Sequence, residues 1–242
     1  MRNQDNNSQT QQSRDKNAEF FLKNLGEYSK SVGQLDTYKR INVALTTELR
    51  GIQSLLDVGN GGVFDYDTFV VGHVIGLDLF LDQLPTDMQI PQNVTMETGD
   101  ALNIPKADNS FDGVVMVMLL HHLVGNSVTQ CTANLERAIS EAFRVLHPGG
   151  KLVIVESCVP LWFYRFEKLV FPLAVPVINR LLTHPPAFQY TVDYISAVIR
   201  NLFGTDPTVT RIPKGKYVLQ FGFKFPARFT PVQPYLLTAC KP

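Results

Sequence analysis

The sequence has few of the features that mark disulfide-rich proteins or proteins that bind duplex nucleic acid. Three cysteines occur among 242 residues, widely spaced and without a Cys-x-x-Cys pair. Neither a disulfide framework nor a metal site is therefore expected. The 22 basic and 22 acidic residues balance, and no run of Lys and Arg is present. A nucleic-acid partner is not expected either, because phosphate binding needs clustered positive charge.

Targeting segments and long uninterrupted apolar runs are also lacking. No basic segment precedes an apolar one near the N-terminus, so no signal peptide is expected and a cytoplasmic location is favoured. The longest apolar stretch, 161–182, contains charged residues and prolines, so a transmembrane segment is not expected. A surface helix that touches a membrane remains open for this stretch, although a lid packed on the sheet is the preferred interpretation.

Composition divides the chain into three parts. Residues 1–17 are rich in Asn and Gln and carry almost no apolar side chains, which predicts a disordered tail. Residues 18–50 are predicted to form an N-terminal helical cap, because apolar residues recur at helical spacing in 35–49. Residues 51–242 are predicted to form one α/β domain.

Strand and helix patterns alternate through this domain. Strands are predicted at 54–58, 73–77, 93–97, 112–118 and 151–155, and the clearest helix at 127–146. The alternation predicts a Rossmann-like, seven-stranded, mainly parallel sheet with helices on both faces. Residues 157–215 show no clear strand and are predicted to be a helical lid between the fifth and sixth strands. Residues 216–225 and 235–240 predict an antiparallel hairpin that closes the sheet, so that the last strand is antiparallel.

The stretch LLDVGNGG, residues 55–62, is a strand that runs into a glycine turn. Such turns let a nucleotide-type cofactor approach the end of a sheet. A dinucleotide fingerprint would need a glycine where Phe64 stands, so an NAD-dependent oxidoreductase ranks low. The alternative is an adenosyl-methionine loop, which Asp57, Gly59 and Gly61 fit together with acids at the ends of later strands.

Four stretches carry a family resemblance in the expected order. They are LLDVGNGG, VIGLDL at 74–79, TGDALNIPKADNSFDGVVMVMLLHHL at 98–123 and EAFRVLHPGGKLVIVE at 141–156. With them the chain resembles the class I S-adenosylmethionine-dependent methyltransferases, in the small-molecule branch of the ubiquinone and menaquinone methyltransferases. The resemblance covers about residues 50–157. It departs from the family at Val63, which stands at the position of the third glycine.

The resemblance implies S-adenosyl-L-methionine as the cofactor. Asp78 would accept hydrogen bonds from the ribose hydroxyls and Asp100 from the adenine amino group, since charge-assisted bonds are strong. Leu79 and Leu102 would enclose the adenine, and Asp57 would order the glycine loop. The implied cofactor-binding residues are Asp57, Gly59, Asn60, Gly61, Asp78, Leu79, Asp100, Ala101, Met118 and Leu119.

The expected function is methyl transfer to a small, apolar or aromatic acceptor. The alternative is a family member that binds the cofactor but is non-catalytic, or that performs another reaction such as a cyclisation. A general base is needed only if the acceptor must lose a proton. His121, His122 and His184 are the candidates, because histidine titrates near neutral pH. Packing or solvated roles stay open for all three.

Overall fold

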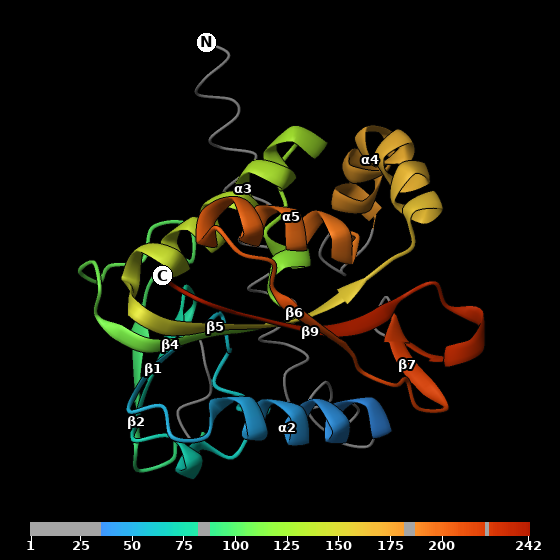
Figure 1. Cartoon of the computed structure of the whole chain (residues 1–242). Coiled ribbons are helices and arrows are strands. Elements are labelled where there is room, and N and C mark those ends of the chain that lie inside the picture. Colours follow the sequence, from blue (N-terminus) through green and yellow to red (C-terminus); the bar gives the residue numbers. More distant parts are fainter. Residues whose placement is uncertain (1–34, 82–87, 182–186, 221–222) are drawn as a thin grey trace.

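The computed structural model describes residues 35–81, 88–181, 187–220 and 223–242. A seven-stranded sheet in the order β3-β2-β1-β4-β5-β9-β6 forms its centre, with helices on both faces (Figure 1). Strands β1 to β5 pair in parallel, whereas β9 is antiparallel to β5 and to β6. The predicted fold class, with an antiparallel last strand, is thereby confirmed.

The elements follow one another along the chain in an alternating pattern. The seven strands of the sheet are β1 Ser54–Val58, β2 His73–Asp78, β3 Val94–Thr98, β4 Phe111–Val117, β5 Leu146–Cys158, β6 Thr208–Arg211 and β9 Gln233–Cys240. The helices are α2 Asp36–Leu49, α3 Val128–Val145, α4 Leu161–Leu181 and α5 Val192–Phe203, with short 3₁₀ turns η1 Thr68–Val70, η3 Leu120–His122 and η4 Ala227–Phe229.

The five parallel strands and two helices agree with the sequence prediction, but the end of the sheet does not. Residues 216–225 form two strands, β7 Tyr217–Gln220 and β8 Phe223–Pro226, which pair with each other in a separate sheet. The predicted hairpin with the last strand is therefore wrong. The sixth strand is β6, which lies inside the segment predicted to lack strands. That segment also forms α4 and α5, and their role as a lid remains a prediction.

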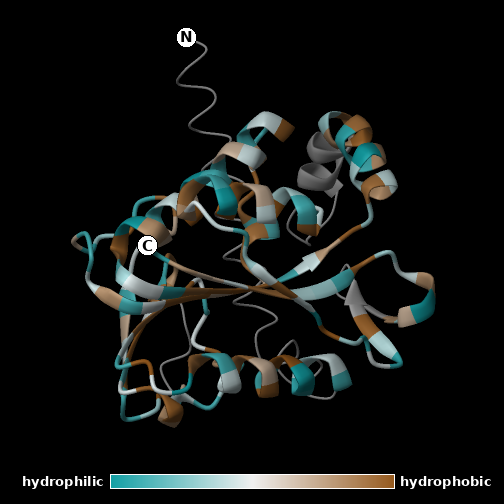
Figure 2. Cartoon of the chain, viewed as in Figure 1, coloured by the Kyte–Doolittle hydropathy of each residue, from teal (hydrophilic) through white to brown (hydrophobic). Residues whose placement is uncertain are grey.

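Two hydrophobic clusters hold the helices to the sheet. Helices α3 and α5 pack on one face, where Leu135, Ile139 and Ile199 are fully buried. Helix α2 covers the other face with Ile41 and Leu45. Apolar residues run along the central strands between these two layers (Figure 2). Within the described residues, no helix is both long and apolar enough to cross a bilayer.

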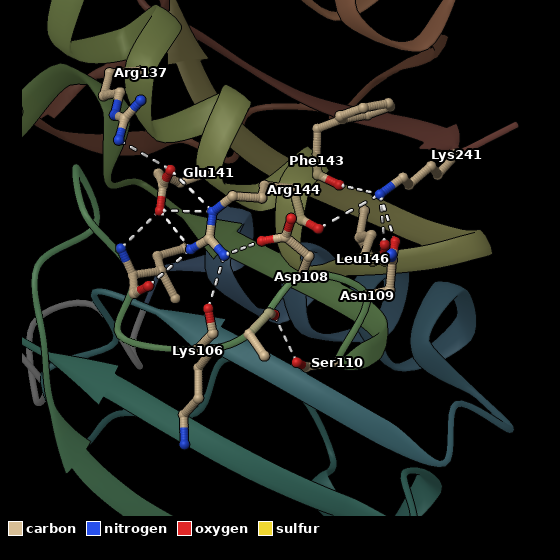
Figure 3. A network of polar contacts seen from close by, with 12 residues as sticks. Lys106, Asp108, Asn109, Ser110, Arg137, Glu141, Phe143, Arg144, Leu146 and Lys241 are labelled. Atoms are coloured by element: carbon tan, nitrogen blue, oxygen red, sulfur yellow. Dashed lines mark hydrogen bonds and ion pairs between the residues drawn. The ribbon is translucent and has the colours of Figure 1, made fainter.

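A polar network fixes the segment after β3 to helix α3 (Figure 3). Glu141 of α3 is almost fully buried and accepts from Ile104 N at 3.0 Å and from Arg144 Nη2 at 2.7 Å. Arg144 also donates to Lys106 O at 2.8 Å and Ile104 O at 2.8 Å. Arg137 Nε donates to a further carbonyl of this segment, Leu102 O, at 3.0 Å. The network thus holds the chain that follows the third strand, where the adenine contacts are predicted.

Replacing Arg144 by Met should destabilise the protein, because the buried Glu141 loses one of its charged partners and the carbonyls of Ile104 and Lys106 lose a donor. We expect the free energy of unfolding to fall by about 2–3 kcal/mol, measured by urea denaturation. The matched control is Arg200→Met, which removes an ion pair with Asp206 in which both side chains are exposed. That change should cost less than about 0.5 kcal/mol. Equal losses in the two variants would contradict a structural role for the network.

Candidate functional site

The carboxyl ends of the parallel strands bring acidic residues to one edge of the sheet. Asp57 and Asp78 lie near the ends of β1 and β2, which pair in register. Glu156 lies near the end of β5 and is fully buried. Ligands of open α/β sheets bind at this edge. The candidate site is therefore built from the loops that follow β1, β2, β3 and β4.

The loop after β1 has the backbone that its glycines predict. Gly59, Gly61 and Gly62 all adopt positive φ, at +72°, +56° and +76°. A Cβ atom at Gly59 would lie 2.5 Å from Leu119 Cδ1, so a side chain at this position would force Leu119 to move. Val63 is not among the described residues with positive φ, because the left-handed conformation falls on Gly62 instead. The displaced third glycine therefore still serves the turn.

No α-helix follows this loop. Residues 59–72 contain one short 3₁₀ turn, η1, and Phe64 packs against the cluster around α2. Dinucleotide sites place the pyrophosphate at the N-terminus of the helix that follows the glycine loop. Their third glycine allows that helix to pack tightly on the strand. The loop therefore lacks the element that a dinucleotide needs, which argues against the NAD alternative.

Asp57, which is predicted to order the glycine loop, contacts that loop through Asn60. Its Oδ2 atom accepts from Asn60 Nδ2 at 3.1 Å and from the Tyr66 hydroxyl at 2.9 Å. Within the described residues, Oδ1 is buried without a hydrogen-bond partner. Burial raises the pKa of Asp57 to about 7, although the two hydrogen bonds oppose this shift. A buried acceptor of this kind suits a positively charged ligand group.

Asp78 connects the second strand to the loop of the first. Its two carboxylate oxygens accept from Gly61 N at 3.0 Å and Phe80 N at 2.9 Å. Each oxygen keeps a lone pair, because a carboxylate offers about four acceptor sites. Asp100 after β3 accepts from Leu102 N at 2.9 Å. Both acids are partly exposed, so the geometry fits the predicted roles in holding an adenosine.

Met118 and Leu119 follow β4, at the position predicted for the methionine arm of the cofactor. Met118 has φ +51°, an unusual conformation for a residue other than glycine. Backbone strain of this kind costs about 1–3 kcal/mol and concentrates at functional sites. Leu119 lies against Gly59, so the loop after β4 touches the glycine loop. The remaining predicted cofactor residues, Leu79 and Ala101, follow β2 and β3 on the same edge.

The structure adds a partner that the sequence prediction missed for His121. The Nδ1 atom of this imidazole lies 2.6 Å from Glu156 Oε1. Glu156 also accepts from Leu120 N at 2.8 Å and Ser157 N at 2.7 Å. This arrangement assigns the Nδ1 proton to the bond with Glu156 and leaves Nε2 as the basic atom. An acid at the end of the fifth strand was visible in the sequence, but its pairing with a distant histidine was not.

A second carboxylate lies near the same histidine. Glu167 of α4 accepts from Gln189 N at 3.1 Å. Burial raises the pKa of Glu167 to about 7, and the neighbouring charge of His121 lowers it in part. The His122 ring stacks at a tilt on His121, with 4.1 Å between the ring centroids. The third candidate base, His184, lies outside the described residues.

Comparisons with known proteins identify the family of the chain. The family model described as Methyltransferase domain matches residues 56–154. A demethylmenaquinone methyltransferase from Renibacterium salmoninarum is 30% identical over 172 residues, which cover 69% of this chain and 68% of that protein. Another from Paenarthrobacter aurescens is 27% identical over 172 residues, covering 69% of this chain but only 64% of its own length.

A solved S-adenosylmethionine-dependent methyltransferase from Thermotoga maritima shares the fold. It superposes with a TM-score of 0.60 at 15% identity, covering 93% of this chain and 99% of that one. The chain belongs to the class I S-adenosylmethionine-dependent methyltransferases, in the branch of the menaquinone methyltransferases. The predicted cofactor class is therefore confirmed, while the individual contact residues stay predictions.

The raised pKa of Asp57 can be tested through the pH dependence of stability, without any ligand. The folded state binds this proton more tightly than the unfolded chain between about pH 4 and 7, so stability from Asp57 is lost as the pH rises through that range. We therefore compare the free energy of unfolding of Asp57→Asn with that of wild type. The difference, variant minus wild type, should rise by about 2–4 kcal/mol between pH 4.5 and pH 8. Urea denaturation at several pH values measures this. A difference that stays constant with pH would contradict the shift.

Proposed function

We propose that this protein transfers the methyl group of S-adenosylmethionine to a small aromatic acceptor of the quinol type. The observation that carries the proposal is the Glu156–His121 pair, 2.6 Å apart. It lies at the sheet edge that also holds the glycine loop, and Leu119 packs against Gly59 two residues before His121. The names of the relatives, demethylmenaquinone methyltransferases, support a quinone-like acceptor.

A base has a clear task with such an acceptor. When bound, the cofactor supplies an electrophilic methyl group on a positively charged sulfur. A ring carbon of a quinol becomes a stronger nucleophile when the neighbouring hydroxyl loses its proton. His121 Nε2 would accept that proton, and buried Glu156 would orient the ring and stabilise the imidazolium. Glu156 is thus a positioning residue, and Glu167 provides a second nearby group that titrates near neutral pH.

The pair borders an aromatic cluster of the protein core. An aromatic cluster joins α4 to the segment before α5, with Phe188 packed between Phe171 and Tyr190 at centroid distances of 4.9 and 5.2 Å. Phe188 N donates to the carbonyl of His121 at 3.0 Å, so the cluster borders the proposed base. Phe171, Phe188 and Tyr190 are buried, so this cluster supports the turn that carries His121.

The alternative of a family member that does not methylate retains one supporting observation. The loop after β1 lacks a following α-helix, and its third glycine is displaced. Incubation with cofactor labelled in the methyl group and a panel of quinols separates the alternatives. Label in the acceptor supports methyl transfer. Cofactor binding with an unlabelled but altered acceptor would instead indicate another reaction such as cyclisation.

Asp78→Ala should weaken cofactor binding by about two orders of magnitude, because two charge-assisted hydrogen bonds are lost. Gly59→Arg should abolish binding, since the side chain would collide with Leu119. Titration calorimetry with adenosyl-homocysteine measures both. Asp206→Ala, an exposed carboxylate on a distant loop, is the control and should bind as wild type. Unchanged affinity in a folded Asp78→Ala protein would refute the ribose assignment.

His121→Ala should lower kcat by about 10²–10⁴-fold while leaving the dissociation constant of adenosyl-homocysteine unchanged. Glu156→Gln should lower kcat less, because the amide still accepts a hydrogen bond but stabilises the imidazolium poorly. His73→Ala is the matched control, since His73 is exposed at the opposite end of β2. A purely structural role would change the melting temperature and cofactor affinity together with kcat. Full activity in His121→Ala would exclude this base.

A further inference from the structure

Exposed apolar side chains concentrate on two segments of the described chain. Five lie on α4, where Trp162, Leu169 and Leu173 are 66%, 76% and 77% exposed. Three lie on the β7–β8 segment, residues 214–230, which includes Phe229 of η4 at 71%. Eight of the twelve large exposed apolar residues identified in the described chain belong to these two segments. Large apolar patches of this kind mark sites of association.

The outward face of α4 is apolar although its inward face is already packed. Tyr164 and Phe171 are buried against Phe188, with ring centroids 5.8 and 4.9 Å away. The exposed residues Trp162, Phe166, Leu169 and Leu173 recur every three or four positions and form a stripe that points to solvent. Helix α4 therefore has a second apolar face that the described fold does not cover.

Both segments leave the sheet from the edge that carries the candidate site. Strands β5 and β6 run in the same direction, because each pairs antiparallel with β9. Helix α4 begins three residues after β5 ends, and the β7–β8 segment follows β6. Figure 1 shows the two at the same end of the molecule, beyond the tip of β5. The exposed apolar residues thus lie on segments that start at the same edge of the sheet as the turn that carries His121.

Basic residues also outnumber acidic residues in the two segments that carry the exposed apolar side chains. Residues 161–181 and 214–230 contain seven of the 22 basic residues but only one of the 22 acidic residues. That acid, Glu167, is half-buried and accepts from Gln189 N at 3.1 Å. Arg165 and Lys168 are exposed beside the apolar stripe, and Arg228 lies over the Phe229 ring at 4.5 Å. Among the described side chains of these segments, Arg165, Lys168, Lys216 and Arg228 are exposed, so basic and apolar groups share this surface.

We propose that this surface, defined by the exposed residues of 161–173, 216–217 and 225–229, docks on an anionic lipid bilayer. Amphipathic helices with basic and aromatic residues bind at the interface of lipid headgroups and acyl chains. An acceptor dissolved in the bilayer would then meet the site edge directly. Lipid binding can be measured without turnover, so failure of this proposal and failure of the proposed reaction are distinguishable.

Trp162 is the single tryptophan of the chain and therefore reports on this surface. The full-length protein is mixed with vesicles of phosphatidylcholine alone, or with about one third phosphatidylglycerol. With the anionic vesicles we expect co-sedimentation and a blue shift of the tryptophan emission. Phe166→Ser/Leu169→Ser/Leu173→Ser should weaken vesicle binding at least about tenfold, and Arg165→Gln/Lys168→Gln by about fivefold per charge.

The matched control is Val43→Ser/Phe69→Ser, which removes equally exposed apolar side chains on α2 and η1. It should bind vesicles as wild type does, and all variants should keep turnover of a short, water-soluble quinol. Absence of sedimentation with anionic vesicles would overturn the proposal, as would equal binding to neutral ones. A blue shift that depends on protein concentration without lipid would mean that a second copy covers this face.

Discussion

Carboxylates at the edge of the sheet hold the loops of neighbouring strands in place, and the candidate site depends on this arrangement. Asp78 at the end of β2 accepts from Gly61, in the loop after β1. Glu156 at the end of β5 accepts from Leu120 and His121, in the loop after β4. In each case a charge on one strand fixes the backbone that follows the adjacent strand. Backbone N–H groups thus satisfy acceptor sites of both carboxylates while the loops are held in place.

This arrangement also explains which parts of the protein could be predicted from sequence. Strands β1, β2 and β5 carry apolar runs that end with an acid at or near the strand end, and β4 is a continuous apolar run, so their positions and their common edge follow from pattern alone. Strand β6 was missed because Thr208–Arg211 has four residues, all exposed, and therefore no apolar pattern. Apolar residues alternate through 216–225, as in a strand. This segment forms two strands, β7 and β8, which pair with each other through Gln220 and Phe223. Alternation indicates a strand without indicating its partner.

The same limit applies to the site. The glycine loop and the acids Asp57 and Asp78 are local motifs, and their spacing was sufficient to place them together. The Glu156–His121 pair joins residues 35 positions apart, and its distance of 2.6 Å comes from the register of β4 and β5. The position of Glu167 depends on how α4 packs against Phe188, which no periodicity in the sequence specifies. Contacts that depend on tertiary packing are therefore the ones that sequence reasoning could not supply.

The loop after β1 lacks the following α-helix that a phosphate-bearing cofactor would need. A helix N-terminus carries about half a positive charge, which favours phosphates. S-adenosylmethionine has no phosphate, and its methionine end carries an ammonium and a carboxylate group beside the positive sulfur, so it does not require a helix N-terminus. Here the loop ends in a 3₁₀ turn, and Asp57 places an uncompensated buried oxygen behind it. Loss of the helix therefore removes a feature that a dinucleotide requires and that a sulfonium does not.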